Sequence, residues 1–97
     1  MNAIRHVVFS GRVQGVGFRA FVEEVAGRHG LEGWVRNRRT GTVEAVFAGS
    51  SGAVAAVIEV CSRGPSSARV DAADQREATA DELALRGGEA FAVLPTV

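Results

Sequence analysis

The pattern of apolar and polar positions along the 97-residue chain predicts short strands that alternate with helices. Residues 4–12 contain a β-branched and aromatic run, HVVF, that is typical of a strand. From Phe18 the apolar spacing becomes that of one helical face, and Gly30 is a natural end for this helix. Residues 33–48 predict a hairpin of two strands that turns at Thr40-Gly41.

The second half of the chain continues with a helix and further strands. The segment Gly49-Ser50-Ser51 offers an N-cap, and the apolar stripe that follows it predicts a helix that ends at Gly64-Pro65. Alternating residues 68–72 predict a fourth strand, whereas 79–88 (TADELALRGG) is interpreted as a loop. Phe91 and Val93 suggest a short final strand.

The order of these elements predicts the fold class. It is β-α-β-β-α-β with one short strand appended, which is the ferredoxin-like, split βαβ order of the α+β class. We expect an antiparallel sheet with two helices on one face, and a single domain over residues 1–97, because no linker or repeat interrupts the pattern. This fold hosts many unrelated functions, so it does not decide among them.

Composition narrows the class of protein further. Apolar residues form 46% of the chain, enough for one core and too many for a disordered segment. The longest apolar run, Ala53 to Ile58, is too short to span a membrane, and the N-terminus lacks the pattern of a signal peptide. We therefore expect a cytoplasmic protein with no membrane partner. A single cysteine, Cys61, and two histidines without metal-ligand spacing give no indication of a metal site.

Charge is distributed unevenly along the chain. Residues 1–49 hold seven arginines and four acids, whereas residues 50–97 hold four arginines and seven acids. A small anionic ligand suits the first half, but the asymmetry is too weak to indicate a nucleic-acid partner. No feature indicates oligomerisation, so we expect a monomer.

Candidate chemistry concentrates in Ser10 to Arg19 (SGRVQGVGFR), where a strand ends, a glycine loop turns and a helix begins. A helix start leaves backbone N–H groups without partners, and glycines allow these groups to converge on an anion. Arg19 adds a charged fork that matches two phosphate oxygens. The segment predicts a phosphate site, although its spacing is neither GxxxxGK[ST] nor GxGxxG. Spacing alone leaves a second interpretation open, a turn selected for packing with Arg19 in solvent.

Residue by residue, the chain resembles the acylphosphatase family. GRVQGVGFR at residues 11–19 is similar to the family's first signature, and GWVRN at 33–37 is similar to its second. The strand GTVEAVF at 41–47 and the segment CSRGP at 61–65 agree as well. The resemblance covers about residues 5 to 93, nearly the whole chain.

The resemblance implies a hydrolase that converts an acyl phosphate and water to a carboxylate and inorganic phosphate, with no cofactor and no metal. It implies that Arg19 binds the phosphate and that Asn37 orients the attacking water. The phosphate-binding residues would be Gln14, Gly15, Val16, Gly17, Phe18 and Arg19. Without the resemblance, an asparagine near a hairpin turn is most simply a turn former. Strand alternation places Asn37 on the same face as Val35.

Hydrolysis of an acyl phosphate requires few functional side chains. The leaving carboxylate has a conjugate acid with a pKa of about 4, so it scarcely needs a general acid. We hypothesise that the substrate's own phosphate accepts the proton of the water. A strong loss of rate on removing a nearby acid such as Glu44 would contradict this route.

Two other functions compete with this one. The first is a non-catalytic module that binds a phosphorylated ligand, or a relic of a carbamoyl-phosphate-handling enzyme, a relative in which such a domain is one part of a long chain. The second is an RNA-binding sheet, to which Val43–Phe47 is a poor match because it lacks exposed aromatic residues. Arg36, Arg38 and Arg39 are most simply a solvated hairpin tip, and Cys61 is most simply a core residue.

Overall fold

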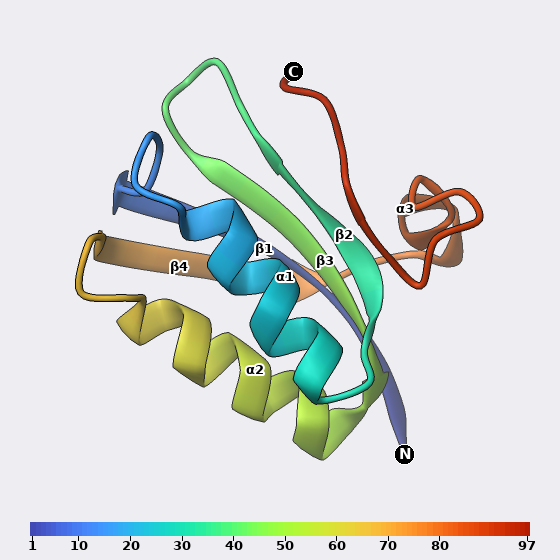
Figure 1. Ribbon diagram of the computed structural model, residues 1–97. Helices are drawn as coiled ribbons and strands as arrows, with labels where there is room; N and C mark the ends of the chain where they lie inside the picture. Colours follow the sequence, from blue (N-terminus) through green and yellow to red (C-terminus); the bar gives the residue numbers. More distant parts are fainter.

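A computed structural model describes all 97 residues as a five-stranded sheet with three helices (Figure 1). Along the chain the elements are β1 (Asn2–Arg12), α1 (Phe18–Arg28), β2 (Glu32–Asn37), β3 (Val43–Ser50), α2 (Ser51–Arg63), β4 (Arg69–Glu77), α3 (Ala80–Ala84) and β5 (Phe91–Val93). Helices α1 and α2 lie side by side over one face of the sheet. The predicted ferredoxin-like α+β fold is confirmed. No helix is both long enough and apolar enough to span a membrane.

The strands are arranged in the order β4-β1-β3-β2-β5. Antiparallel pairs join β1 to β3, β1 to β4, and β2 to β3. The short appended strand β5 pairs with β2 in parallel, so the sheet is mixed. Strand β1 therefore lies between β3 and β4, and its end leads directly into the glycine loop.

The chain beyond β5 continues along β2. The amide of Leu94 donates to the Val35 carbonyl at 2.9 Å, and the amide of Val97 donates to the Asn37 carbonyl at 3.2 Å. The Val97 carbonyl in turn accepts from the amide of Arg39 at 2.7 Å. The C-terminal residues thus support the end of β2 and the start of the hairpin turn.

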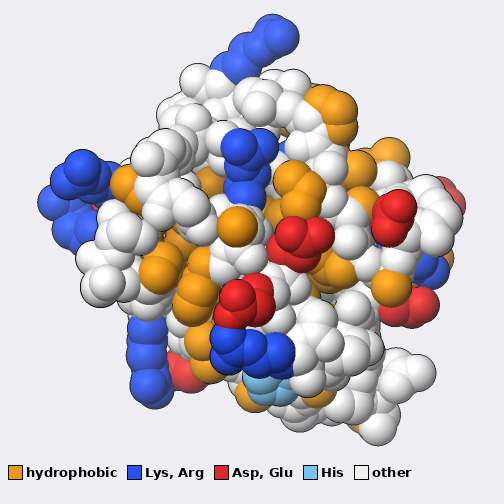
Figure 2. All heavy atoms as spheres, in the orientation of Figure 1, with side chains coloured by type: hydrophobic (Ala, Val, Ile, Leu, Met, Phe, Trp, Pro, Cys, Tyr) orange, Lys and Arg blue, Asp and Glu red, His pale blue; other side chains and the backbone are white.

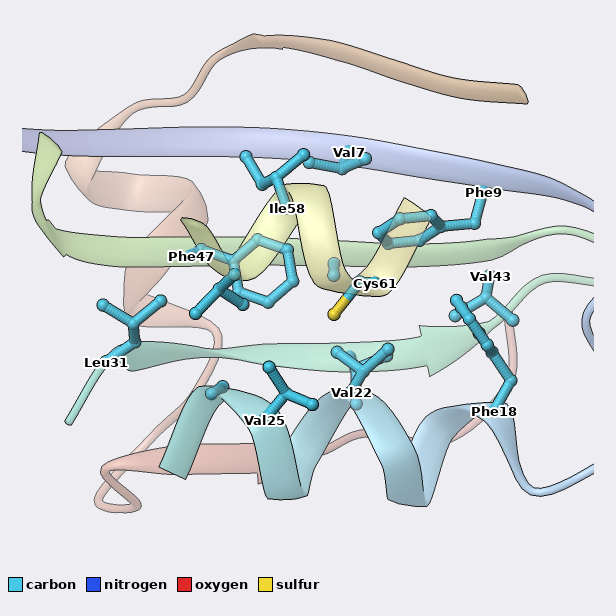
Figure 3. Packing of buried hydrophobic residues seen from close by; sticks show 14 of the residues in the cluster. Val7, Phe9, Phe18, Val22, Val25, Leu31, Val43, Phe47, Ile58 and Cys61 are labelled. Atoms are coloured by element: carbon cyan, nitrogen blue, oxygen red, sulfur yellow. The ribbon is translucent and has the colours of Figure 1, made fainter. Parts of the chain in front are cut away.

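The main core lies between the sheet and the two long helices. Its 16 buried residues come from β1, β2, β3, α1, α2 and the segments between them. Figure 3 shows Val7 and Phe9 of β1 facing Ile58 and Cys61 of α2, with Phe18 at one end of the core. Cys61 is fully buried, and this burial raises the pKa of its thiol to about 12. The prediction that Cys61 is a core residue is confirmed.

The predicted ends of the long helices are also found. The Ser50 side chain accepts a hydrogen bond from the Ala53 amide at 3.2 Å and caps α2, which ends at Arg63 with Gly64 as its C-cap at φ 68°. Helix α1 ends at Arg28, and Gly30 follows with φ 66°. A positive φ is readily accessible to glycine, so these positions stop the helices as expected.

The prediction of a loop at residues 79–88 is wrong, because α3 lies within it. The Thr79 side chain accepts from the Glu82 amide, and the Glu82 carboxylate accepts from the Thr79 amide, which together form a capping box. Leu83 packs against Trp34, Val46 and Ala92 on the sheet face opposite α1 and α2. The Trp34 indole N–H donates to the Glu82 carbonyl at 2.7 Å, which fixes α3 on this face.

The face of the sheet opposite α1 and α2 also carries a network of charged side chains. Glu44 lies 2.7 Å from His6 Nε2 and accepts from Arg36 Nε at 2.7 Å. The Arg36 guanidinium also lies over the Trp34 ring, 4.6 Å from its centroid. Only 20% of the Arg36 side chain is exposed, so its assignment to a solvated hairpin tip is wrong. Burial opposes ionisation of Glu44, but the hydrogen bonds and charges of His6 and Arg36 hold its pKa below the usual 4.5.

The Glu44 network predicts a pH-dependent stability. Because the pKa of Glu44 is lower in the folded chain, its contribution is complete above pH 4.5 and is lost as the pH falls below that value. We expect Glu44→Gln to lower the free energy of unfolding by about 2 kcal/mol at pH 7. The difference from the wild type should narrow below pH 4.5, measured by urea denaturation.

Glu59→Gln is a matched control, because Glu59 pairs with Arg63 on an exposed helix surface. It should change the free energy of unfolding by less than about 0.5 kcal/mol. An effect of Glu44→Gln that is the same at every pH would contradict the proposed ionisation of Glu44 in the network.

The capping box of α3 gives a second prediction. Thr79→Ala removes the side-chain cap, so we expect a loss of about 1 kcal/mol in the free energy of unfolding. Trp34 is the only tryptophan and bonds to α3, so loosening of this helix should shift its fluorescence to longer wavelength under native conditions. Ser50→Ala, which removes the cap of α2, should cost similar stability without that shift. Unchanged Trp34 emission in Thr79→Ala would show that the cap does not hold α3 in place.

Candidate active site

The glycine loop connects two buried anchors. Val13 and Phe18 are each only 1% exposed, and the four residues between them turn the chain from β1 into α1. Gly15 and Gly17 have φ angles of 73° and 80°. A Cβ atom at either position would meet no atom within 4 Å, so the backbone angle, and not lack of space, favours glycine there.

This loop presents backbone donors without partners. The amides of Gln14 to Gly17 donate to no other group of the protein. The amides in the first turn of α1 have no acceptor within the helix, and the N-cap Gly17 offers no side chain. No acidic residue lies in that turn. The arrangement can therefore bind an anion through backbone N–H groups and the positive end of the helix.

Arg19 lies in the first turn of α1, partly buried, and its guanidinium forms no ion pair or hydrogen bond within the protein. Six of the eleven arginines pair with acids, and Arg5 bonds to Gln75. The arginines without such a partner are Arg12, Arg19, Arg38 and Arg39. All four lie at the ends of β1 and β2 or at the start of α1. The basic side chain at the top of Figure 2 has no acidic side chain beside it.

Asn37 is the last residue of β2. The side chains of Trp34 and Arg36 lie on the far face of the sheet, the face opposite α1 and α2, whereas Val35 is part of the core beneath the helices. Strand alternation therefore places the Asn37 side chain on the same side as α1. Its Oδ1 atom is buried and accepts no hydrogen bond within the protein. A buried carbonyl oxygen of this kind requires a donor, which a water molecule or ligand can supply.

Side chains join the loop to its neighbours. Gln14 Nε2 donates to the carbonyls of Arg38 at 2.7 Å and Thr42 at 2.8 Å, both in the hairpin that follows Asn37. On the other side, Ser67 Oγ donates to the Val16 carbonyl at 2.9 Å. The structure thus brings the predicted phosphate loop against the hairpin. Neither side-chain contact could be predicted from the sequence, since no local pattern marks them.

Glu44 does not belong to this site, and the expectation that it is a nearby acid is wrong. It pairs across the sheet with Arg36 and lies on the far face, opposite to the side of Asn37. Neither the loop nor the hairpin turn contains an acidic residue. Two hollows on the surface of the protein are lined by residues of β1, β4 and Ala78, and neither is lined by a residue of the glycine loop. This site offers donors and positive charge, but no side chain placed as a general base.

Comparisons with known proteins agree with these features. Residues 5–89 match the model of the Acylphosphatase family. An acylphosphatase from Bradyrhizobium diazoefficiens is 58% identical, over 99% of this chain and 98% of its own length. The crystal structure of acylphosphatase from Bacillus subtilis superimposes with a TM-score of 0.83 at 33% identity, over 97% of this chain and 99% of that one.

A longer protein contains the same fold. Full-length HypF, in its phosphate- and nucleotide-bound form, matches with a TM-score of 0.83 at 26% identity. The match covers 99% of this chain but only 12% of HypF. The family model and the relative of nearly equal length decide the assignment. The chain belongs to the acylphosphatase family and is a hydrolase.

Proposed function

We propose that the chain hydrolyses the carboxyl–phosphate bond of acyl phosphates to give a carboxylate and inorganic phosphate. It would act as a single-domain monomer, without a metal or cofactor. The observation that carries the proposal is the row of unpartnered amides from Gln14 to Gly17, followed in the first turn of α1 by Arg19, whose guanidinium has no partner in the protein. The relative from Bradyrhizobium diazoefficiens, named an acylphosphatase and of almost the same length, supports it.

Phosphate binding follows from the donors of the loop. The amides of residues 14–19 surround the phosphoryl oxygens, and Arg19 donates two parallel hydrogen bonds to them. As the bond to the leaving carboxylate lengthens, these donors stabilise the charge on the transferring phosphoryl group. The unpaired Arg12, Arg38 and Arg39 add a positive field that attracts the anionic substrate.

Asn37 positions the attacking water. Its buried Oδ1 accepts a hydrogen bond from the water, which then lies in line with the bond to be broken. The water oxygen forms a bond to phosphorus, and the electron pair of the breaking P–O bond leaves with the carboxylate. One water proton moves to a phosphoryl oxygen and the other stays on the attacking oxygen, so the products are a carboxylate and dihydrogen phosphate. No side-chain acid or base is required, because the leaving carboxylate is weakly basic.

A binding module without turnover is the second candidate. The match to a small part of HypF, whose structure is described as phosphate- and nucleotide-bound, favours it as an alternative. In that case the loop and Arg19 would bind a phosphorylated ligand, and Asn37 would act only as a turn residue.

The rate of phosphate release from benzoyl phosphate tests the proposal, measured in the presence of a chelator. We expect turnover by the wild type, and a fall of about two or more powers of ten for both Arg19→Ala and Asn37→Ala. Arg19→Ala should also weaken competitive inhibition by inorganic phosphate, whereas Asn37→Ala should leave that inhibition nearly unchanged.

Arg28→Ala is the matched control for Arg19→Ala, because it removes an arginine from the other end of α1. Its turnover should equal that of the wild type. A folded wild type that binds phosphate but releases none from benzoyl phosphate would favour the binding module and exclude the hydrolytic role of Asn37.

A further inference from the structure

We propose that the side chain of Gln14 is a positioning residue that fixes Asn37 relative to the phosphate loop. This inference rests on the proposed function, and it concerns the side chain of Gln14, not its backbone amide. Gln14 belongs to the loop, whereas the two carbonyls that it contacts belong to the hairpin that carries Asn37. The side chain therefore connects the two halves of the site directly.

The geometry of the contact restrains both partners. Gln14 Nε2 uses its two N–H groups, one for the Arg38 carbonyl at 2.7 Å and one for the Thr42 carbonyl at 2.8 Å. Because both partners are carbonyl acceptors, the end of the Gln14 side-chain amide that contacts them is its nitrogen. Arg38 directly follows Asn37, and Thr42 lies on the returning side of the turn. One amide group thus holds both sides of the hairpin against the loop.

No other hydrogen bond joins the loop to the hairpin. The remaining side-chain contact of the loop, from Ser67 to Val16, leads to the segment between α2 and β4. Between the loop and Asn37, the chain passes through the whole of α1 and β2. Without Gln14, packing of Val13 and Phe18 would be the main restraint on the separation of phosphate and water.

The contact is not needed to close the hairpin itself. The Arg38 amide donates to the Thr42 carbonyl at 2.9 Å, and the Gly41 amide donates to the Arg38 carbonyl at 3.0 Å. Both carbonyls therefore keep a partner when the Gln14 side chain is changed. We expect such variants to fold, with the loop and the hairpin free to shift relative to each other.

Gln14→Met tests the role, because methionine has a similar length and no donor. A shift of about 1 Å between reacting groups costs about a hundredfold in rate, so we expect kcat for benzoyl phosphate to fall ten- to hundredfold. The inhibition constant of inorganic phosphate should change by less than about threefold, because the loop amides and Arg19 stay in place. Gln14→Asn, which keeps the donor but is one methylene shorter, should show a smaller fall in kcat and supplies the test if Gln14→Met does not fold.

Gln75→Met is the matched control, since Gln75 is the only other glutamine, is exposed, and bonds to the Arg5 side chain. It should keep the wild-type kcat. An unchanged kcat in both Gln14 variants would overturn the proposal. A loss confined to phosphate affinity would also overturn the proposal, because it would show that the Gln14 side chain affects only the conformation of the phosphate loop.

A binding measurement separates this proposal from the hydrolase function. In an NMR titration with inorganic phosphate, wild-type binding should shift the loop amides and also the side-chain amide of Asn37. In Gln14→Met the loop amides should still shift, whereas the Asn37 signal should respond much less. This comparison does not require turnover, so it decides the role of Gln14 even for a chain that hydrolyses no acyl phosphate. An equal Asn37 response in both proteins would contradict the proposal.

Discussion

Between Val13 and Phe18 the chain has to pass from the end of β1 to the first helix within four residues, and both anchors are buried. The backbone meets this constraint with positive φ at Gly15 and Gly17. A residue with a Cβ atom would be strained in that conformation by about 1–2 kcal/mol. The same turn leaves the amides of the loop without acceptors. The burial of Val13 and Phe18 in the core thus determines the backbone conformation of the loop between them. That conformation in turn exposes the amides that can bind an anion.

The second half of the site depends on the alternation of β2. Arg36 is held on the far face by Glu44 and by the ring of Trp34, and a strand that fixes one residue on one face fixes the next on the other. The side of the sheet on which Asn37 lies is therefore determined partly by contacts that never touch the substrate side. Gln14 then joins this strand end to the loop. A site with few functional side chains can be well ordered because its backbone is restrained from both faces.

Most of the fold could be predicted from apolar spacing and from caps such as Ser50, because these signals are local. Helix α3 was missed although Thr79 and Glu82 show the spacing of a capping box, since its single turn has no apolar stripe. Strand β4 continues to Glu77, beyond the predicted residues 68–72. This extension could not be predicted, because an exposed edge strand lacks the contrast of buried and polar positions. At the site, the loop was evident from its glycines. The side of Asn37 followed from alternation, whereas the contacts of Gln14 depend on residues that are 24 and 28 positions away.

The hydrogen bonds of Val97 to Asn37 and Arg39 have a practical consequence. A purification tag, dye or surface linker attached after Val97 would start beside the hairpin and crowd the anionic substrate. The amide of Ser51 donates to the Met1 carbonyl, and Asn2 pairs with Ser50, at the opposite end of β1 from the loop. An attachment before Met1 therefore leaves the loop accessible, so immobilisation and fluorescent labelling are best made at the N-terminus (Figure 1).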